Sequence, residues 1–166
     1  MVLKRTAPNA LPWLGLSLLI ILLDYLSKQW ALDTLTMHSP VPVIEGFWQW
    51  TLTFNYGAAF SFLSEHGGWQ RWLFSGLAIV LSALMTYMLS RTGRGDWKQA
   101  LPLALIIGGA IGNLIDRIRY GYVVDFVDWY WRDYHWPAFN VADSAIVAGA
   151  IGLAVFGFVG GEQEKK

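Results

Sequence analysis

The chain has 166 residues, of which 55% are hydrophobic and only 14% are charged, with zero formal net charge and a mean hydropathy of +0.39. This composition is typical of an integral membrane protein and excludes the basic surface that nucleic-acid binding needs. There is no cysteine, and the three histidines have no ligand-like spacing, so we expect no metal site and no other cofactor.

Four apolar stretches, 11–31, 69–89, 100–120 and 141–159, are each close to the roughly 20 residues that cross a bilayer. The first follows two basic residues, as a secretory signal does, but no small-residue cleavage site comes after it. The sequence therefore predicts one all-α membrane domain over 1–166. It has four transmembrane helices and a small β-stranded outer, periplasmic segment.

The basic residues predict the orientation of these helices. Lys and Arg precede the first helix, follow the last, and occur at Arg91, Arg94 and Lys98 between the second and third. Between Gln29 and Gln70 there is no Lys or Arg, and the segment after the third helix is mostly acidic. By the positive-inside rule, both termini lie in the cytoplasm and the two longer connections face outward.

The first outer connection contains a β-segment at about 41–62. Residues 48–55 alternate large apolar side chains with more polar ones, which predicts a half-buried strand. Gly57 and two alanines then predict a tight turn before Phe60 and Phe62. Such a strand either lines a groove at the membrane surface or only caps the helices.

The first helix carries an acid and a base, Asp24 and Lys28, on one face at i and i+4. Two unpaired charges would cost roughly 5–7 kcal/mol, enough to cancel the insertion energy of the surrounding Leu and Ile residues. The two side chains therefore pair, reach the interface or face the bundle interior. An ion pair that only joins helices explains them as well as a functional role does.

In the third helix, Gly108 and Gly112 form a small-xxx-small surface. Asn113, Asp116 and Arg117 follow on one face, one turn later. This polar patch is either interfacial, or it marks the close approach of another helix or of a substrate backbone.

Asp125 and Asp143 lie in apolar settings on the same side of the predicted membrane. Asn140 predicts a helix N-cap that places Asp143 at the third helical position, which is an ordinary role for an acid. Asp125, among valines and a phenylalanine, is harder to explain as a solvated residue. If the two meet, one ionises and the other keeps its proton, so that one activates water while the other polarises a carbonyl.

Five motifs follow one another along the chain: DYLSK at 24–28, NYGAAFS at 55–61, GGAIGNLIDR at 108–117, VVDF at 123–126 and FNVADS at 139–144. Together they resemble the bacterial lipoprotein signal peptidases, the signal peptidase II family. They occur in the family's order and span nearly the whole chain.

The resemblance implies an aspartic endopeptidase of the bacterial inner membrane, working as a monomer near the outer face without a cofactor. Its partners would be membrane lipids and a prolipoprotein with diacylglycerol on its cysteine, which it would cleave just before that cysteine. Asp125 and Asp143 would be catalytic. Substrate-binding residues would be Asn55, Gly57, Asn113, Arg117 and Asn140, with Asp24, Lys28 and Asp116 as supporting residues.

Two other classes of protein remain as alternatives. A small proton-coupled carrier would use Asp24, Lys28, Asp125 and Asp143 as a relay. A non-catalytic membrane assembly factor would use the acids structurally. Against the carrier, the polar residues gather in the outer halves of the predicted helices, whereas a relay needs polar groups across the whole membrane.

Overall fold

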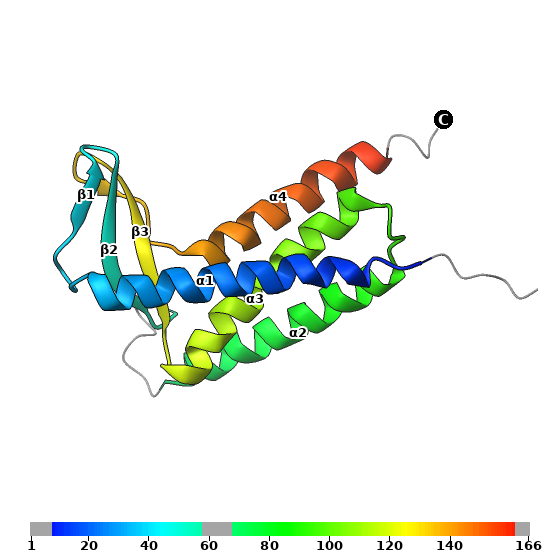
Figure 1. The fold of residues 1–166 in the computed structure, drawn as a ribbon, viewed down its shortest axis with the longest axis horizontal. Helices are drawn as coiled ribbons and strands as arrows, with labels where there is room; N and C mark the ends of the chain where they lie inside the picture. Colours follow the sequence, from blue (N-terminus) through cyan, green and yellow to red (C-terminus); the bar gives the residue numbers. More distant parts are fainter. Residues whose placement is uncertain (1–7, 58–67, 162–166) are drawn as a thin grey trace, which may run out of the picture.

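The computed structural model describes residues 8–57 and 68–161, with side chains described as far as Gly157 in the last helix. Within these residues, a 3-10 helix η1 (Leu11–Trp13) precedes four α-helices, which form an elongated bundle with a small sheet across one end (Figure 1). The α-helices are α1 (Leu14–Thr34), α2 (Trp69–Arg91), α3 (Trp97–Arg119) and α4 (Val141–Gly161).

Two helices begin at different residues from those expected. The first was expected from residue 11, but Pro12 lies in η1 and α1 begins at Leu14. The third was expected from residue 100 and begins at Trp97, because the Asp96 carboxylate accepts a hydrogen bond from the Gln99 backbone N–H at 3.4 Å. Asp96 is therefore an N-cap that the hydropathy pattern did not reveal.

Three helical segments are long and apolar enough to cross a membrane: Leu11–Thr34, Trp69–Arg91 and Trp97–Arg119. The described part of the fourth helix, Val141–Gly157, is apolar but shorter. A mostly helical membrane protein with a small sheet is therefore confirmed, whereas the number of four spanning helices stays a prediction.

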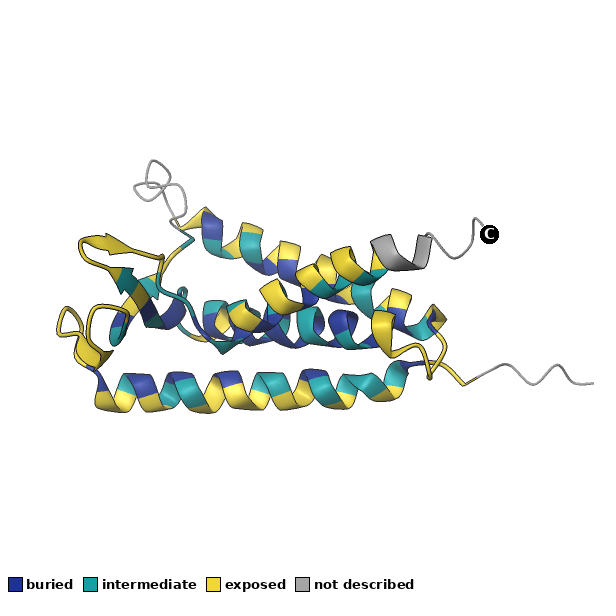
Figure 2. Cartoon of the chain, turned by 90° about the horizontal axis from the view of Figure 1, so that it is seen from above, coloured by how far each residue is buried: buried dark blue, intermediate teal, exposed yellow. Residues whose placement is uncertain are grey.

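Helix α3 is the centre of the bundle. Over an apolar stretch of 18 residues in each span, 56% of the residues of α3 are buried. The corresponding share is 17% for Leu11–Thr34 and 22% for Trp69–Arg91. Exposed residues cover the outer faces of the other helices (Figure 2). Since α3 carries much of the predicted polar face, those side chains are turned away from lipid.

Glycines on α3 allow this close packing. A Cβ on Gly108 would lie 2.8 Å from the Cβ of Ile20 on α1, and a Cβ on Gly112 would lie 2.7 Å from the Asp24 carboxylate. Gly109 lies directly against the Ala142 carbonyl of α4. The small-xxx-small surface is therefore a helix contact, as the sequence suggested.

The sheet is antiparallel, in the order β1-β2-β3-β4, and is formed by β1 (Val41–Ile44), β2 (Trp48–Asn55), β3 (Val123–Trp131) and β4 (Tyr134–His135). Strand β2 matches the predicted 48–55, while the end of the expected segment, 58–62, lies outside the described residues. Strand β3 lies in the mostly acidic segment after the third helix, where the sequence predicted no strand. Its first four residues are all buried, so the period-two alternation that reveals a half-buried strand is absent.

Strand β3 is held on both sides. On one side it pairs with β2 from Trp48↔Trp129 to Asn55↔Val123, with a register shift between Trp50 and Thr53 that leaves two β2 residues opposite Phe126. On the other side, Phe139 exchanges backbone hydrogen bonds of 2.9 and 3.0 Å with Val127 and accepts a third from Phe126 at 3.1 Å.

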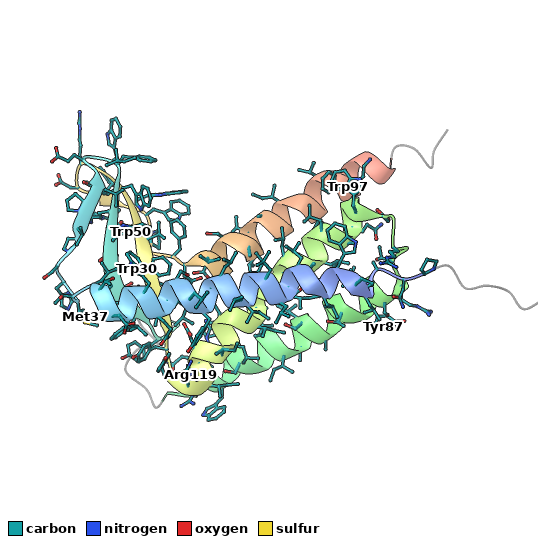
Figure 3. The ribbon with its side chains drawn as sticks, in the orientation of Figure 1. Trp30, Met37, Trp50, Tyr87, Trp97 and Arg119 are labelled. Atoms are coloured by element: carbon teal, nitrogen blue, oxygen red, sulfur yellow. The ribbon has the colours of Figure 1, made fainter. Side chains whose placement is uncertain are left out.

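A buried apolar cluster joins the sheet to the end of α1. It consists of Ala31, Leu35, Leu52, Val124 and Phe126, and Trp30 packs edge-on against Trp50 at 5.2 Å beside it (Figure 3). Because Val124 and Phe126 flank Asp125, this cluster fixes the position of that aspartate relative to the bundle.

We expect Gly109→Ala to destabilise the protein by about 1–3 kcal/mol, because the new methyl group collides with the Ala142 carbonyl and with Ile146 Cγ1 at 2.8 Å. Gly157→Ala is the matched control, since a Cβ there meets nothing within 4 Å. Thermal unfolding of both variants in detergent measures the effect. Equal melting temperatures would contradict a tight α3–α4 contact.

Candidate active site

A buried lysine, Lys28 on α1, lies at the centre of the polar residues. Its side chain is 1% exposed, and its ammonium group contacts the carboxylates of Asp24 at 2.7 Å and Asp116 at 3.0 Å. It also donates a hydrogen bond to Asn113 Oδ1 at 3.0 Å. An ammonium has three donors, and here each has an acceptor. Of the three outcomes expected for Asp24 and Lys28, the structure shows an ion pair that faces the bundle interior, and the contacts of Lys28 with Asp116 and Asn113 join α1 to α3.

Both carboxylates that contact Lys28 also hold backbone next to the two candidate catalytic residues. Asp24 Oδ1 accepts a hydrogen bond from the Ala142 N–H at 2.9 Å, in the first turn of α4. Asp116 Oδ2 accepts one from the Val124 N–H at 3.1 Å, on β3. The ion pairs therefore tie α1 and α3 to the chain on either side of the site.

Two asparagines link Asp125 to Asp143. Asn113 Nδ2 donates to Asp143 Oδ1 at 2.7 Å, and Asn140 Nδ2 donates to Asp125 Oδ1 at 2.7 Å. Asn140 Nδ2 also lies 3.2 Å from Asn113 Oδ1. Because Lys28 is only a donor, Asn113 must turn its oxygen toward it and its amide N–H toward Asp143. The lysine thus fixes which way the Asn113 amide faces.

Asn140 and Asp143 also cap α4 reciprocally. Asn140 Oδ1 accepts a hydrogen bond from the Asp143 N–H at 2.8 Å, and Asp143 Oδ2 accepts one from the Asn140 N–H at 3.3 Å. This is a capping box. The ordinary explanation for Asp143, a helix cap, is therefore right, and it does not exclude a shared site because the other carboxylate oxygen faces Asn113.

Asp125 lies in a drier environment than Asp143. Its side chain is buried on β3, with only 2% of the residue exposed, whereas Asp143 is partly exposed. Burial raises the pKa of Asp125 to about 7, and the charge of Asp143 acts in the same direction. Hydrogen bonds from Asn55 and Asn140 and the charge of Lys28 hold the pKa from rising further. At neutral pH, Asp125 is therefore poised to carry a proton.

The structure brings Arg117 and Asn55 to the same place. Arg117 is half-buried, interacts electrostatically with Asp143 and Asp125, and lies over the Phe74 ring at 5.3 Å. The Asn55 side chain reaches Asp125 and, through Oδ1, accepts a hydrogen bond from the Gly57 N–H at 2.9 Å.

Gly57 has a left-handed backbone, with φ of +93°, and a Cβ there would lie 2.5 Å from the Phe74 ring. Within this structure the close approach at Gly57 is therefore that of Phe74. Asn113 and Asn140, expected to hold substrate, here hold the two carboxylates. Their contact with substrate stays a prediction.

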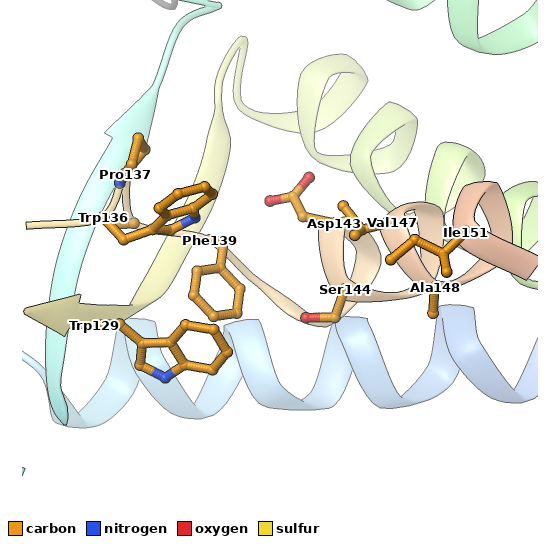
Figure 4. A pocket seen from close by; sticks show the side chains of 10 residues that line it. Trp129, Trp136, Pro137, Phe139, Asp143, Ser144, Val147, Ala148 and Ile151 are labelled. Carbon is orange, nitrogen blue, oxygen red and sulfur yellow. The ribbon is translucent and has the colours of Figure 1, made fainter. Parts of the chain in front are cut away.

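Sequence reasoning missed a groove of about 540 Å³ beside Asp143. It lies between the first turns of α4 and the aromatic rings of Trp129, Trp136 and Phe139 (Figure 4). The aromatic residues were visible in the sequence, but tryptophan is so common at membrane interfaces that it did not indicate a groove.

A second missed cluster lies farther along the sheet. The buried Asp128 carboxylate accepts a hydrogen bond from Gln49 Nε2 at 2.6 Å and lies 2.8 Å from His135 Nδ1. Asp128 belongs to the mostly acidic segment after the third helix, for which the sequence indicated no specific role, and here it fastens β2, β3 and β4 together. Among residues 8–57 and 68–161, no group of three or more His, Asp or Glu residues is placed to hold a metal ion.

Comparison with known proteins gives one consistent family. A family model described as Signal peptidase (SPase) II matches residues 16–159. The Lipoprotein signal peptidase of Xanthomonas campestris pv. campestris (strain 8004) is 57% identical over 163 residues, which is 98% of each chain. That of Xylella fastidiosa (strain M12) is 60% identical over 152 residues, covering 92% of this chain and 91% of its own.

Two solved structures, each described as a bacterial membrane enzyme, share the fold. One superposes with a TM-score of 0.81 at 25% identity, covering 98% of this chain and 97% of its own. The other has a TM-score of 0.73 at 26% identity, covering 87% and 90%.

We expect Lys28→Met to destabilise the protein by about 3–5 kcal/mol, because it leaves Asp24 and Asp116 buried without a counter-charge. Lys98→Met, at an exposed position, is the control. Thermal unfolding in detergent measures both variants. A Lys28→Met protein as stable as Lys98→Met would show that the ion pairs contribute little.

Proposed function

The chain belongs to the signal peptidase II family, and from this premise we propose that it is an aspartic endopeptidase in which Asp125 and Asp143 activate water. As a lipoprotein signal peptidase it removes signal peptides from prolipoproteins. The bond cleaved lies just before a cysteine that already carries diacylglycerol. This cleavage site is part of the proposal and follows from the family resemblance of the five motifs.

One observation carries the proposal: two carboxylates with different environments are joined through two asparagines. Asp125 is buried with a pKa of about 7, and Asp143 faces the groove with hydrogen bonds at both oxygens. Pairs of carboxyl groups with unequal environments divide acid and base roles between them. Asp125 is the proton donor and Asp143 the acceptor.

The reaction then follows without a covalent intermediate. The Asp143 carboxylate takes a proton from a water molecule, whose oxygen attacks the scissile carbonyl carbon. Asp125 gives its proton to the carbonyl oxygen as negative charge develops there. Collapse of the tetrahedral intermediate then breaks the C–N bond: Asp143 gives its proton to the leaving amine, and Asp125 takes a proton back from a hydroxyl of the intermediate, which restores the Asp125–Asp143 dyad. Arg117 provides positive charge near both carboxylates.

We place the site near the outer face of the bacterial inner membrane, with both termini in the cytoplasm. The basic residues Arg91, Arg94 and Lys98 lie at the end of the bundle opposite the sheet, which supports this orientation. Aromatic residues gather at both ends of the helices, including Tyr87 and Trp97 at one and Trp30 and Trp50 at the other (Figure 3). That spacing suits two membrane interfaces, with α4 as a fourth span in a monomer.

The distribution of buried charge favours the peptidase over a proton-coupled carrier. The buried charged side chains that the structure describes are Asp24, Lys28, Asp116, Asp125 and Asp128. Asp125 and Asp128 lie on β3, and Asp116 lies in the last turn of α3, at the sheet end of the bundle. Asp24 and Lys28 lie between the middle of α1 and that end. In the described halves of the helices away from the sheet, no buried carboxylate continues a relay.

We expect Asp125→Asn and Asp143→Asn each to lower kcat/KM by at least about 10²-fold, because each removes a group that must exchange a proton. Asp33→Asn, at an exposed position, is the matched control. Purified variants are assayed on a diacylated prolipoprotein, and their folding is checked by thermal unfolding. Wild-type activity in either dyad variant would refute the assignment.

The pH profile tests the role of Asp125 separately. We expect kcat/KM to fall as the pH rises through about 7, because Asp125 then loses the proton it donates. The Asn55 hydrogen bond lowers the pKa of Asp125, so Asn55→Ala should raise that pKa and move the alkaline limb to higher pH. Asn9→Ala, remote from the site, should leave the limb in place. A limb that does not move, or moves down, contradicts the assignment.

A further inference from the structure

The groove beside Asp143 has two unlike walls. One consists of the rings of Trp129, Trp136 and Phe139, and the other is the face of α4 from Asp143 to Ile151 (Figure 4). Apart from Asp143 and Ser144, at the end nearest the dyad, all the residues that line the groove are apolar. The groove thus begins at a candidate catalytic carboxylate and becomes apolar away from it.

We propose that this groove binds one acyl chain of the substrate's diacylglyceryl group, with its ester end near Asp143 and its methyl end toward Ile151. The inference rests on the proposed function, which places a lipidated cysteine next to the scissile bond. The groove is then a subsite in which the acyl chain has a defined direction, and the residues that line it determine the preferred chain length. The second acyl chain remains in the bilayer.

The polarity of the groove favours an acyl chain over a peptide segment. Its two polar side chains are already engaged: Ser144 Oγ donates to the Asn140 carbonyl at 2.9 Å, and Asp143 accepts hydrogen bonds at both oxygens. A signal-peptide segment lying extended along the groove would leave backbone N–H and C=O groups without partners in an apolar site, which is strongly unfavourable. An acyl chain has no such groups.

The far end of the groove opens among residues that face lipid. Val147 is 56% exposed and Ile151 is 58% exposed, on a helix that lies in the membrane in the placement proposed above. From Asp143 to Ile151 the helix rises about 12 Å at 1.5 Å per residue. An acyl chain can therefore leave the hydrocarbon and reach the dyad without crossing water or a charged surface.

The aromatic wall is rigid enough to select for shape. The Trp129 ring packs edge-on against the Phe139 ring, with ring centroids 4.9 Å apart. The backbone N–H of Trp136 donates a hydrogen bond to the backbone carbonyl of Trp129 at 2.7 Å. Phe139 itself is fixed by its backbone bonds to β3. A preformed apolar wall binds a flexible chain with less ordering cost than a mobile one.

The opposite wall carries small side chains at Ser144 and Ala148. Ala148 is exposed and lines the groove, so a larger side chain there fills the groove without entering the helix core. Ala150 is also exposed on α4 but does not line the groove. The pair offers the same substitution at two positions of one helix, only one of which narrows the proposed subsite.

The test compares two synthetic prolipoproteins that differ only in the diacylglyceryl group, dipalmitoyl or dibutyryl. The readout is the ratio of their kcat/KM values for the purified full-length enzyme. We expect Ala148→Phe to lower the dipalmitoyl-to-dibutyryl ratio at least about tenfold, since several buried methylene groups lose their site. Ala150→Phe should keep the wild-type ratio.

An Ala148→Phe enzyme with the wild-type ratio overturns the inference, whether its activity is unchanged or falls equally on both substrates. An equal fall indicates that the groove holds peptide instead. Val147→Trp narrows the groove from another exposed position and gives a second ratio if Ala148→Phe does not fold. If the wild-type enzyme cleaves neither substrate, it is the proposed function that fails.

Discussion

The charge of one buried lysine must be neutralised inside the bundle, and the rest of the site depends on how this is done. A lone ammonium in an apolar interior is costly, and the cost is offset only when each of its donors has an acceptor. For Lys28 the acceptors come from Asp24, Asp116 and Asn113, on two helices. Each acceptor in turn contacts a residue at or beside the dyad. The contacts that pack α1 against α3 are therefore also contacts that assemble the site.

The two aspartates differ because they belong to different kinds of structure. Asp125 lies in a strand flanked by Val124 and Phe126, where burial disfavours its charge. Asp143 lies in the first turn of a helix, where its side chain accepts a hydrogen bond from the Asn140 N–H. A sheet and a helix N-terminus brought side by side thus supply, from the same residue type, the acid and the base that the proposed mechanism needs.

The sequence predicted those parts of the site that follow from local spacing. The i, i+4 placement of Asp24 and Lys28 put their ion pair among the expected outcomes, and the Asn140–Asp143 spacing predicted the helix cap. The alternation of 48–55 gave β2. Strand β3 was not predictable by pattern, because burial on both faces removes the alternation. The asparagine links were hidden too, since they join residues 15 and 30 positions apart along the chain. Catalytic roles came only from family resemblance, which composition and periodicity do not supply.

The backbone bonds of Phe139 to Val127 and Phe126 have a consequence for how the chain can vary. These hydrogen bonds close the loop between β3 and α4, which contains β4, immediately before Asn140. The distance between the two aspartates is therefore set by this closure and not by the residues between them. Arg132, with φ of +56°, lies at the tip of the β3–β4 hairpin. Insertions or deletions near it can lengthen or shorten this loop without separating Asp125 from Asp143. One added residue between Phe139 and Asp143 would instead turn the carboxylate about 100° around the helix axis and away from its partner. Tolerance to length change should therefore differ sharply between two places only a few residues apart.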